Sequence, residues 1–219
     1  VRTTPLEQVK KRTEGLSVLL VDVKEALGKG LSMQRIDTMI NHQTNALFFD
    51  NMEVPAENLI GIEGQGFRYI LDSMNSERLV VAAQSLGDCR FFINKAVAYS
   101  KERVVFGRPI GQNQGIQFPL ARCYAEWKAA DLMIRAGCAL FEAGKPCGEE
   151  ANMAKLLASE AAWHSAEACM QTHGGFAAAR EFDVERKWRD ARISMIAPIS
   201  TNLILAYIGQ NVLGMPRSY

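Results

Sequence analysis

The feature that most constrains the fold is a long stretch of helical periodicity over residues 64–105. Apolar residues recur three and four positions apart at its start, at Phe67, Ile70 and Met74, as they do on one face of an α-helix. The stretch contains no proline, and Gly87 interrupts it only at modest cost. The pattern predicts one helix of about 40 residues, which is long for a globular protein.

Three further stretches have helical character, at residues 115–142, 149–172 and 200–212. Short turns and one polar, glycine-rich loop separate the four segments. Amphipathic helices joined in this way predict an antiparallel four-helix bundle. On the third helix we expect one face to carry Met153, Leu157, Ala161, His164 and Ala168.

Residues 1–62 differ from the rest and predict a small β segment before a helical domain at residues 63–219. Apolar runs at residues 15–23 and 44–54 are typical of strands, and Pro55 closes the second. Two or three strands make a poor unit alone and need more sheet or a helical surface. The predicted fold class is therefore mainly α, with a four-helix bundle preceded by a small β segment.

Composition excludes several classes of function. The net charge is +1, so the basic stripe of a nucleic-acid-binding protein is not expected. No apolar run is long enough for a membrane span. No signal peptide is expected at the start. The cysteines and histidines have neither disulfide-framework nor metal-ligand spacing, so we expect no metal site and a reducing, cytoplasmic location. They are Cys89, Cys123, Cys138, Cys147, Cys169, His42, His164 and His173.

Glu77 and Arg78 lie inside the long helical stretch between apolar neighbours. Apolar surroundings can tune a carboxylate to act as a general base near neutral pH, although an adjacent arginine acts in the opposite direction. The alternative is an ion pair on a solvated helix face.

Arg103 and Gln114 flank a glycine-rich loop that has the residue types of a phosphate site. Arginine presents a planar fork that binds phosphate through two hydrogen bonds, and Gln114 offers a second polar contact. The alternative is a helix C-terminus whose basic residues complement the helix dipole.

Residues 171–175, Gln-Thr-His-Gly-Gly, end a helix in a double glycine. Glycine leaves backbone N–H groups that can approach a phosphate or a ring closely. His173, beside the glycines, is a candidate ligand contact. The charged residues that follow, over 181–190, predict a solvated segment with ion pairs.

Taken together, these motifs resemble the acyl-CoA dehydrogenase family over nearly the whole chain. The patterns that carry the resemblance are Arg103-x-x-Phe106-Gly107 followed by Gln114, then Gln171-x-x-Gly174-Gly175, then Arg189-Asp190-Ala191-x-Ile193, with residues 51–61 similar to the end of the family's middle β-domain. The resemblance implies FAD as cofactor and a homotetramer built as a dimer of dimers.

The resemblance also implies roles for particular residues. Asn75 and Arg78 match positions that line the acyl-CoA site. The positions that match FAD contacts, typically with the FAD of the neighbouring subunit, are Arg103, Phe106, Gln114, Gln171, Gly174, Gly175, Ser200 and Asn202.

The catalytic base is the point at which the chain departs from the usual pattern. The position that holds a glutamate in most of the family is Pro198 here. The isovaleryl-CoA and long-chain branches carry the base in a Glu-Arg-Leu sequence on the first long helix, which Glu77-Arg78-Leu79 matches. The resemblance therefore implies Glu77 as the base that removes the α-proton.

The implied reaction is oxidation of an acyl-CoA to the trans-2-enoyl-CoA, with electrons passing to an electron-transfer flavoprotein. The family's N-terminal helical domain and the first half of its β-domain have no counterpart here. Two alternatives are a non-catalytic or half-enzyme helical module that acts in oligomer assembly, and an acyl-CoA oxidase.

Overall fold

A computed structural model describes residues 1–40 and 43–217 of the chain. His42, one of the three histidines considered above, lies outside the described residues. The chain forms two compact units, Val1–Met74 and Asn75–Tyr219. Helix α2 (Gly66–Glu102) begins in the first unit and continues through the second.

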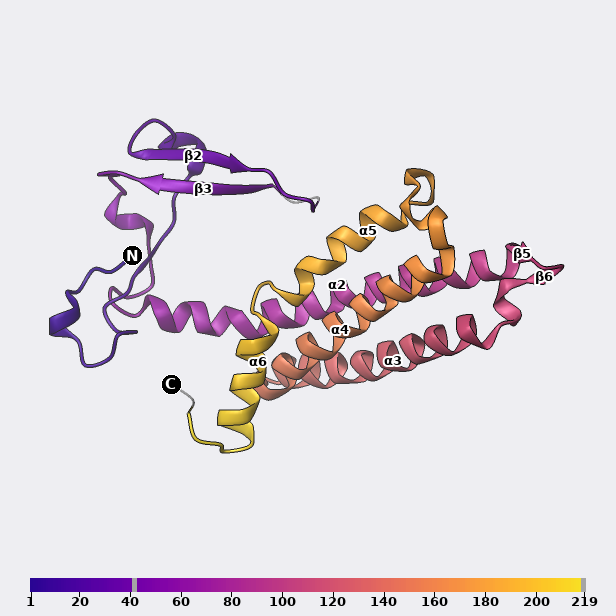
Figure 1. The fold of residues 1–219 in the computed structure, drawn as a ribbon. Coiled ribbons are helices and arrows are strands. Elements are labelled where there is room, and N and C mark those ends of the chain that lie inside the picture. Colours follow the sequence, from indigo (N-terminus) through magenta and orange to yellow (C-terminus); the bar gives the residue numbers. More distant parts are fainter. Residues whose placement is uncertain (41–42, 218–219) are drawn as a thin grey trace. The chain divides into compact units, whose positions relative to one another are not determined.

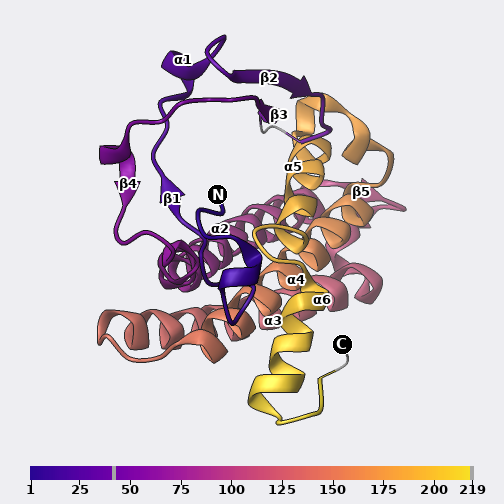
Figure 2. The same ribbon diagram turned by 90° about the vertical axis from the view of Figure 1, so that its left-hand side faces the viewer.

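The first unit contains short antiparallel strand pairs. Strand β2 (Leu31–Ile36) pairs with β3 (Thr44–Phe49), as Figure 1 shows. Strand β1 (Val18–Leu19) pairs with β4 (Leu59–Ile60), on the opposite side of the unit in Figure 2. The remaining elements are the one-turn helix α1 (Val23–Ala26) and 3-10 turns at Leu6–Gln8 and Ala56–Asn58.

The strand predicted at residues 15–23 is wrong over most of its length. Only Val18–Leu19 forms strand, because the Asp22 carboxylate accepts hydrogen bonds from the main-chain N–H groups of Lys24 and Glu25 and starts α1. The second predicted strand is confirmed over residues 44–49 and ends before Asn51, whose φ is +48°. Strand β2 was not predicted, since Arg35 breaks its alternation of apolar and polar residues.

The β2–β3 hairpin exposes apolar side chains, including Met33, Leu47 and Phe48. Such a hairpin is marginal by itself. This agrees with the sequence expectation that these strands need further covering structure.

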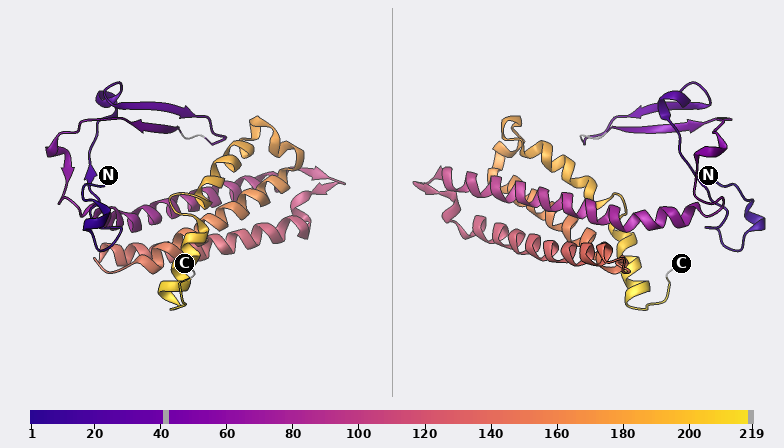
Figure 3. Two further views of the ribbon diagram at one scale, coloured as in Figure 1. Left: turned by 60° about the vertical axis from the view of Figure 1, so that its left-hand side comes forward. Right: turned by 180° about the vertical axis from the view of Figure 1, so that it is seen from behind.

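The second unit is a helical bundle. Helices α2, α3 (Gln114–Glu142) and α4 (Gly148–His173) run antiparallel and side by side, as Figures 1 and 3 show. Helix α5 (Val184–Ala191) packs along α4, and α6 (Thr201–Tyr207) continues into a π-helical turn at Ile208–Val212. The four predicted helices and the predicted fold class are confirmed.

Short elements connect these helices. Strands β5 (Val104–Val105) and β6 (Arg108–Pro109) form a hairpin between α2 and α3, followed by a 3-10 turn at Ile110–Gln112. Further 3-10 turns follow α4 and α5, at Gly174–Ala178, Arg180–Phe182 and Arg192–Met195.

The core lies where α2, α3 and α4 face one another. Phe92 of α2 is fully buried, and Leu79 and Ile134 are nearly so. The buried face of α4 consists mainly of small residues, among them Ala151, Ala154, Ala158, Ser159, Ala162, Ser165 and Ala166. The face predicted for α4 is therefore wrong, since only Ala161 of that set is buried and Leu157 and His164 are exposed.

The prediction of a solvated segment at residues 181–190 also needs correction. It contains helix α5, whose Val184 and Ala191 are buried against the bundle while its charged residues pair on the other face. Lys187 also forms an ion pair with Asp88 of α2. This stretch is amphipathic rather than merely solvated.

Candidate cofactor site and active site

The β5–β6 hairpin turns through two residues with positive φ, Phe106 at +52° and Gly107 at +75°. Paired positive φ values match the twist of a two-residue hairpin, but they are uncommon for a residue other than glycine. The Phe106 side chain is fully exposed. Sparsely populated backbone conformations cluster at binding and active sites, so this turn is a candidate contact site.

Arg103 links α2 to this hairpin through its backbone. Its N–H donates to the carbonyl of Tyr99, and its own carbonyl accepts from the N–H of Ile110, both at 2.9 Å. Arg108 donates to Oδ1 of Asn113 at 2.9 Å. The base of the hairpin is therefore fixed on both sides, and so is the backbone position of Arg103.

The double glycine ends α4. Gly174 has φ +59° and ψ −136°, a conformation that is essentially restricted to glycine. Its N–H faces the carbonyls of Gln171 and Met170. A Cβ built on Gly174 or Gly175 would meet no atom within 4 Å, so the turn has open space beside its backbone.

Arg103, Gln171, Gly174 and Gly175, which are far apart in the sequence, line one cavity of about 540 Å³. The Arg103 guanidinium lies 5.6 Å from the centre of the Phe176 ring. The other lining residues are Tyr99, Val105, Ile110, Thr172, His173 and Phe176. Tyr99 and Phe176 were not predicted, although Tyr99 lies only four residues before Arg103, in the last turn of α2.

The lining does not include the other predicted cofactor contacts. Phe106 stands at the hairpin tip, and Gln114 is the first residue of α3. Ser200 caps α6, accepting from the N–H of Leu203 at 3.4 Å, and Asn202 is exposed in the first turn of that helix.

The segment before α6 carries Pro198 and is tied to the bundle by Lys155. This lysine of α4 is fully buried, and burial lowers its pKa to about 8. Its Nζ donates to the carbonyl of Ile199 at 2.8 Å. Thr201 Oγ1 donates to the carbonyl of Met195 at 3.3 Å, which closes the segment on itself.

Asn75 and Arg78 form a second cluster. Nη1 of Arg78 donates to Oδ1 of Asn75 at 2.8 Å. Burial lowers the pKa of Arg78, while the nearby Tyr207 and Glu77 act to raise it. Within the described residues, Nε of Arg78 is buried with no hydrogen-bond partner, so this guanidinium has one donor left unsatisfied.

Tyr207 and α4 complete this cluster. A Cβ on Gly148 would lie 2.9 Å from Oη of Tyr207 and 3.9 Å from Nδ2 of Asn75. Asn152 donates to the carbonyl of Gly148 at 2.7 Å, and its buried Oδ1 has no partner within the described residues. The side chain of Glu77, adjacent to Arg78, is exposed.

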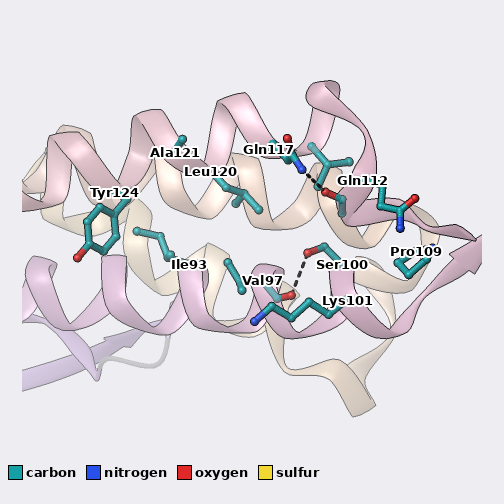
Figure 4. A pocket seen from close by; sticks show the side chains of 12 residues that line it. Ile93, Val97, Ser100, Lys101, Pro109, Gln112, Gln117, Leu120, Ala121 and Tyr124 are labelled. Carbon is teal, nitrogen blue, oxygen red and sulfur yellow. Dashed lines mark hydrogen bonds between the residues drawn. The ribbon is translucent and has the colours of Figure 1, made fainter.

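A separate apolar cavity of about 540 Å³ lies between α2 and α3. Figure 4 shows Ile93 and Val97 of α2 facing Leu120 of α3, with Lys101 along the opening. None of the predicted site residues lines this cavity.

Neither a metal-binding cluster nor a membrane-spanning helix is found among the described residues. In residues 1–40 and 43–217, no cluster of three or more His, Cys, Asp or Glu side chains could bind a metal ion. The five cysteines are free. No helix within the same ranges has the length and apolarity to cross a membrane.

Comparison with known proteins identifies the family. The profile of the acyl-CoA dehydrogenase C-terminal domain matches residues 64–213. An acyl-CoA dehydrogenase of Mycobacterium bovis is 38% identical over 79% of this chain and 45% of its own length. A subunit of the caffeyl-CoA reductase–Etf complex of Acetobacterium woodii is 33% identical over 86% of this chain and 50% of its own length.

The fold agrees with this assignment. The structure of butyryl-CoA dehydrogenase from Megasphaera elsdenii superposes with a TM-score of 0.86 and 32% identity, covering 94% of this chain and 54% of that one. The chain spans about half the length of the relatives it matches. The chain therefore belongs to the acyl-CoA dehydrogenase family and corresponds to a C-terminal portion of its members.

Proposed function

We propose that this chain is the C-terminal portion of an FAD-dependent acyl-CoA dehydrogenase that introduces an α,β double bond into an acyl-CoA thioester. The observation that carries the proposal is the cavity in which Arg103 meets Gln171, Gly174 and Gly175. In this proposal residues 1–62 are the end of the middle β-domain, and residues 63–219 are the helical domain.

The residues around this cavity fit FAD. Arg103 offers a planar fork for a phosphate, and Gln171 adds an amide. Gly174 and Gly175 leave space beside their backbone, so a ligand can approach the main chain closely. Phe106, Gln114, Ser200 and Asn202 are proposed as further contacts because they match family positions. FAD bound there would supply the acceptor for the hydride that leaves the β-carbon.

Glu77 is proposed to take the proton from the α-carbon. Its side chain is exposed on α2 directly beside Arg78, so the two groups can act on the same substrate. Asn75 holds one end of the guanidinium, and the unpartnered Nε of Arg78 is proposed to bind an oxygen of the substrate. Stabilising the charge that develops on the thioester oxygen is a main requirement of this reaction.

Electron-transfer flavoprotein is the proposed redox partner, in keeping with the Etf complex to which the Acetobacterium relative belongs. A homotetramer built as a dimer of dimers is the proposed assembly. Apolar side chains exposed on the bundle, such as Val80 and Leu132, are surfaces that association would cover. The free cysteines agree with a cytoplasmic location, where thiols stay reduced.

Flavin reduction in Glu77→Gln tests the proposal. The full chain should purify with flavin absorbance, and an acyl-CoA should bleach this absorbance under anaerobic conditions. Glu77→Gln should keep the flavin but slow the bleaching by roughly 10²–10⁴-fold, the range for loss of a general base. Glu142→Gln, a change of an exposed glutamate at the end of α3, should leave the rate unchanged.

The outcomes separate the alternatives. Bleaching at the wild-type rate in Glu77→Gln would exclude Glu77 as base. A wild-type chain that binds neither FAD nor acyl-CoA would indicate a helical module that acts in assembly. Rapid formation of hydrogen peroxide under air would indicate an oxidase.

A further inference from the structure

His173, the last residue of α4, is buried among aromatic rings. Only 3% of the residue is exposed, and its ring stacks on Tyr99 with centroids 4.2 Å apart and planes at 22°. The rings of His173 and Phe182 pack in an edge-to-face arrangement, with centroids 5.8 Å apart. Nδ1 lies 2.9 Å from the carbonyl oxygen of Cys169. Because a carbonyl only accepts hydrogen bonds, Nδ1 carries the hydrogen, and Nε2 of the neutral ring has a lone pair.

The charge balance of the cavity that holds His173 is incomplete for a diphosphate. Within the described residues, Arg103 is the one permanently cationic side chain in the lining. The diphosphate of FAD carries two negative charges. The C-terminus of α4 also contributes partial negative charge, so the helix itself disfavours an anion here. A second positive charge is needed, and His173 is the lining residue that can supply it.

The groups around the imidazole keep it neutral while the cavity holds no anion. Burial lowers the pKa of His173, the hydrogen bond to the Cys169 carbonyl raises it, and Lys95 of α2 lowers it. Tyr99 of α2 and Arg103, which directly follows α2, also face the site. The Cys169 thiol, 3.7 Å from Nδ1, stays protonated because burial raises its pKa to about 12. An anion that enters the cavity would favour the protonated imidazole and so raise the pKa of His173.

We propose that His173 is a further cofactor-binding residue, which takes up one proton from solution when the FAD diphosphate enters the cavity and then donates Nε2–H to a phosphate oxygen. The inference rests on the proposed function. It adds a residue that interacts with the phosphate charge and not with the flavin ring. It also makes the affinity for the cofactor depend on pH.

The sign of this dependence follows from linkage. Because the anion raises the pKa of His173, the complex binds more protons than the free protein does. The dissociation constant for FAD should therefore decrease as pH falls through the pKa of the complex, by up to ~10-fold per pH unit, and level off below the pKa of the free protein.

Isothermal titration of FAD into the full chain between pH 5.5 and 8 tests the inference. Measurement in buffers of different ionisation enthalpy gives the number of protons taken up, which should approach one within this range for wild type and zero for His173→Asn. His164→Asn is the matched control, because His164 is an exposed histidine of the same helix, paired with Glu126. Riboflavin, which lacks the diphosphate, should show no uptake that depends on His173.

NMR titration of the wild-type histidines gives a second measurement, independent of whether His173→Asn folds. With only three histidines in the chain, the pKa of His173 can be followed, and it should rise when FAD is added. Equal proton uptake in wild type and His173→Asn, or an unchanged His173 pKa, would overturn this inference while leaving the proposed function intact. Failure of wild type to bind FAD would overturn both.

Discussion

Nζ of Lys155 donates a hydrogen bond to the main-chain carbonyl of Ile199 at 2.8 Å. The lysine is fully buried in α4, and Ile199 directly precedes Ser200, the residue that caps α6. One charged side chain therefore fixes the start of α6, with its proposed cofactor contacts, to the centre of the bundle. Burying an ammonium group has a free-energy cost that depends on pH.

Lys155→Met should change how stability depends on pH. Burial lowers the folded-state pKa of Lys155 to about 8, whereas an unfolded lysine titrates near ~10.4. Between these values the unfolded chain binds the proton that the folded chain has lost, so the free energy of unfolding rises with pH. The stability of wild type relative to Lys155→Met should therefore rise by on the order of 2 kcal/mol from pH 7.5 to 10.

Urea unfolding at several pH values measures the difference in unfolding free energy between wild type and Lys155→Met. The contributions of the other titrating groups cancel in this difference. Lys145→Met, a change of an exposed lysine in the turn before α4, should leave the dependence as in wild type. Parallel curves for wild type and Lys155→Met would show that burial does not shift the titration of Lys155.

Gly174→Ala should weaken both the fold and cofactor binding. The φ of +59° and ψ of −136° are strained for alanine, at about 1–3 kcal/mol, and relief of that strain would move the turn beside Gln171. Gly87→Ala, in the exposed interior of α2 with no atom within 4 Å of the new Cβ, should instead stabilise by roughly 0.5–1 kcal/mol. Thermal unfolding and FAD titration of both variants test the contrast, and equal effects would contradict it.

Arg78→Lys should impair substrate binding without loss of flavin. Lysine keeps the positive charge but cannot reproduce the planar fork that binds Asn75 and leaves Nε available. Loss of a charged hydrogen bond of about 1.5–3 kcal/mol corresponds to a KM for acyl-CoA that is ~10–100-fold higher. Steady-state kinetics measure the KM, and the visible absorbance of the purified variant measures its flavin content. Loss of flavin in the variant would show that Arg78 has a structural role instead.

Phe92→Ala should destabilise the bundle by about 3–5 kcal/mol, because a fully buried phenyl ring would leave a cavity between helices that cannot close around it. Leu132→Ala is the comparison, since Leu132 is 69% exposed on α3 and its loss should change stability by about 0.5 kcal/mol or less. Chemical denaturation in urea compares the two. A similar loss of unfolding free energy in both variants would show that Phe92 does not belong to the core of the bundle.

The sequence predicted the long helices because their periodicity extends over many turns. It missed α5, where charged residues hide the spacing of Val184, Trp188 and Ala191 along one face. The buried face of α4 was misassigned because large apolar residues were favoured over alanines, whereas close helix contact requires small side chains. Strand β2 was missed because Arg35 follows Gln34 and breaks its alternation of apolar and polar residues.

The candidate site was predictable where a local motif specifies it, as at Arg103 and the double glycine. Contacts between distant segments were not predictable. The hydrogen bond from Lys155 to Ile199 and the approach of Tyr207 to Gly148 join residues more than forty positions apart, and no spacing rule in the sequence connects them.

The small residues of α4 have a mechanical consequence. Alanine has no rotatable side-chain bond, so the alanines of this face lose no side-chain entropy on folding and cannot adopt another rotamer to make room for an added methyl group. The backbone of α4 therefore lies close to the neighbouring helices, and these close contacts set the distance between them. A larger residue at Ala154 or Ala158 would shift the whole of α4. It would therefore also move the glycine turn at the end of α4 relative to Arg103.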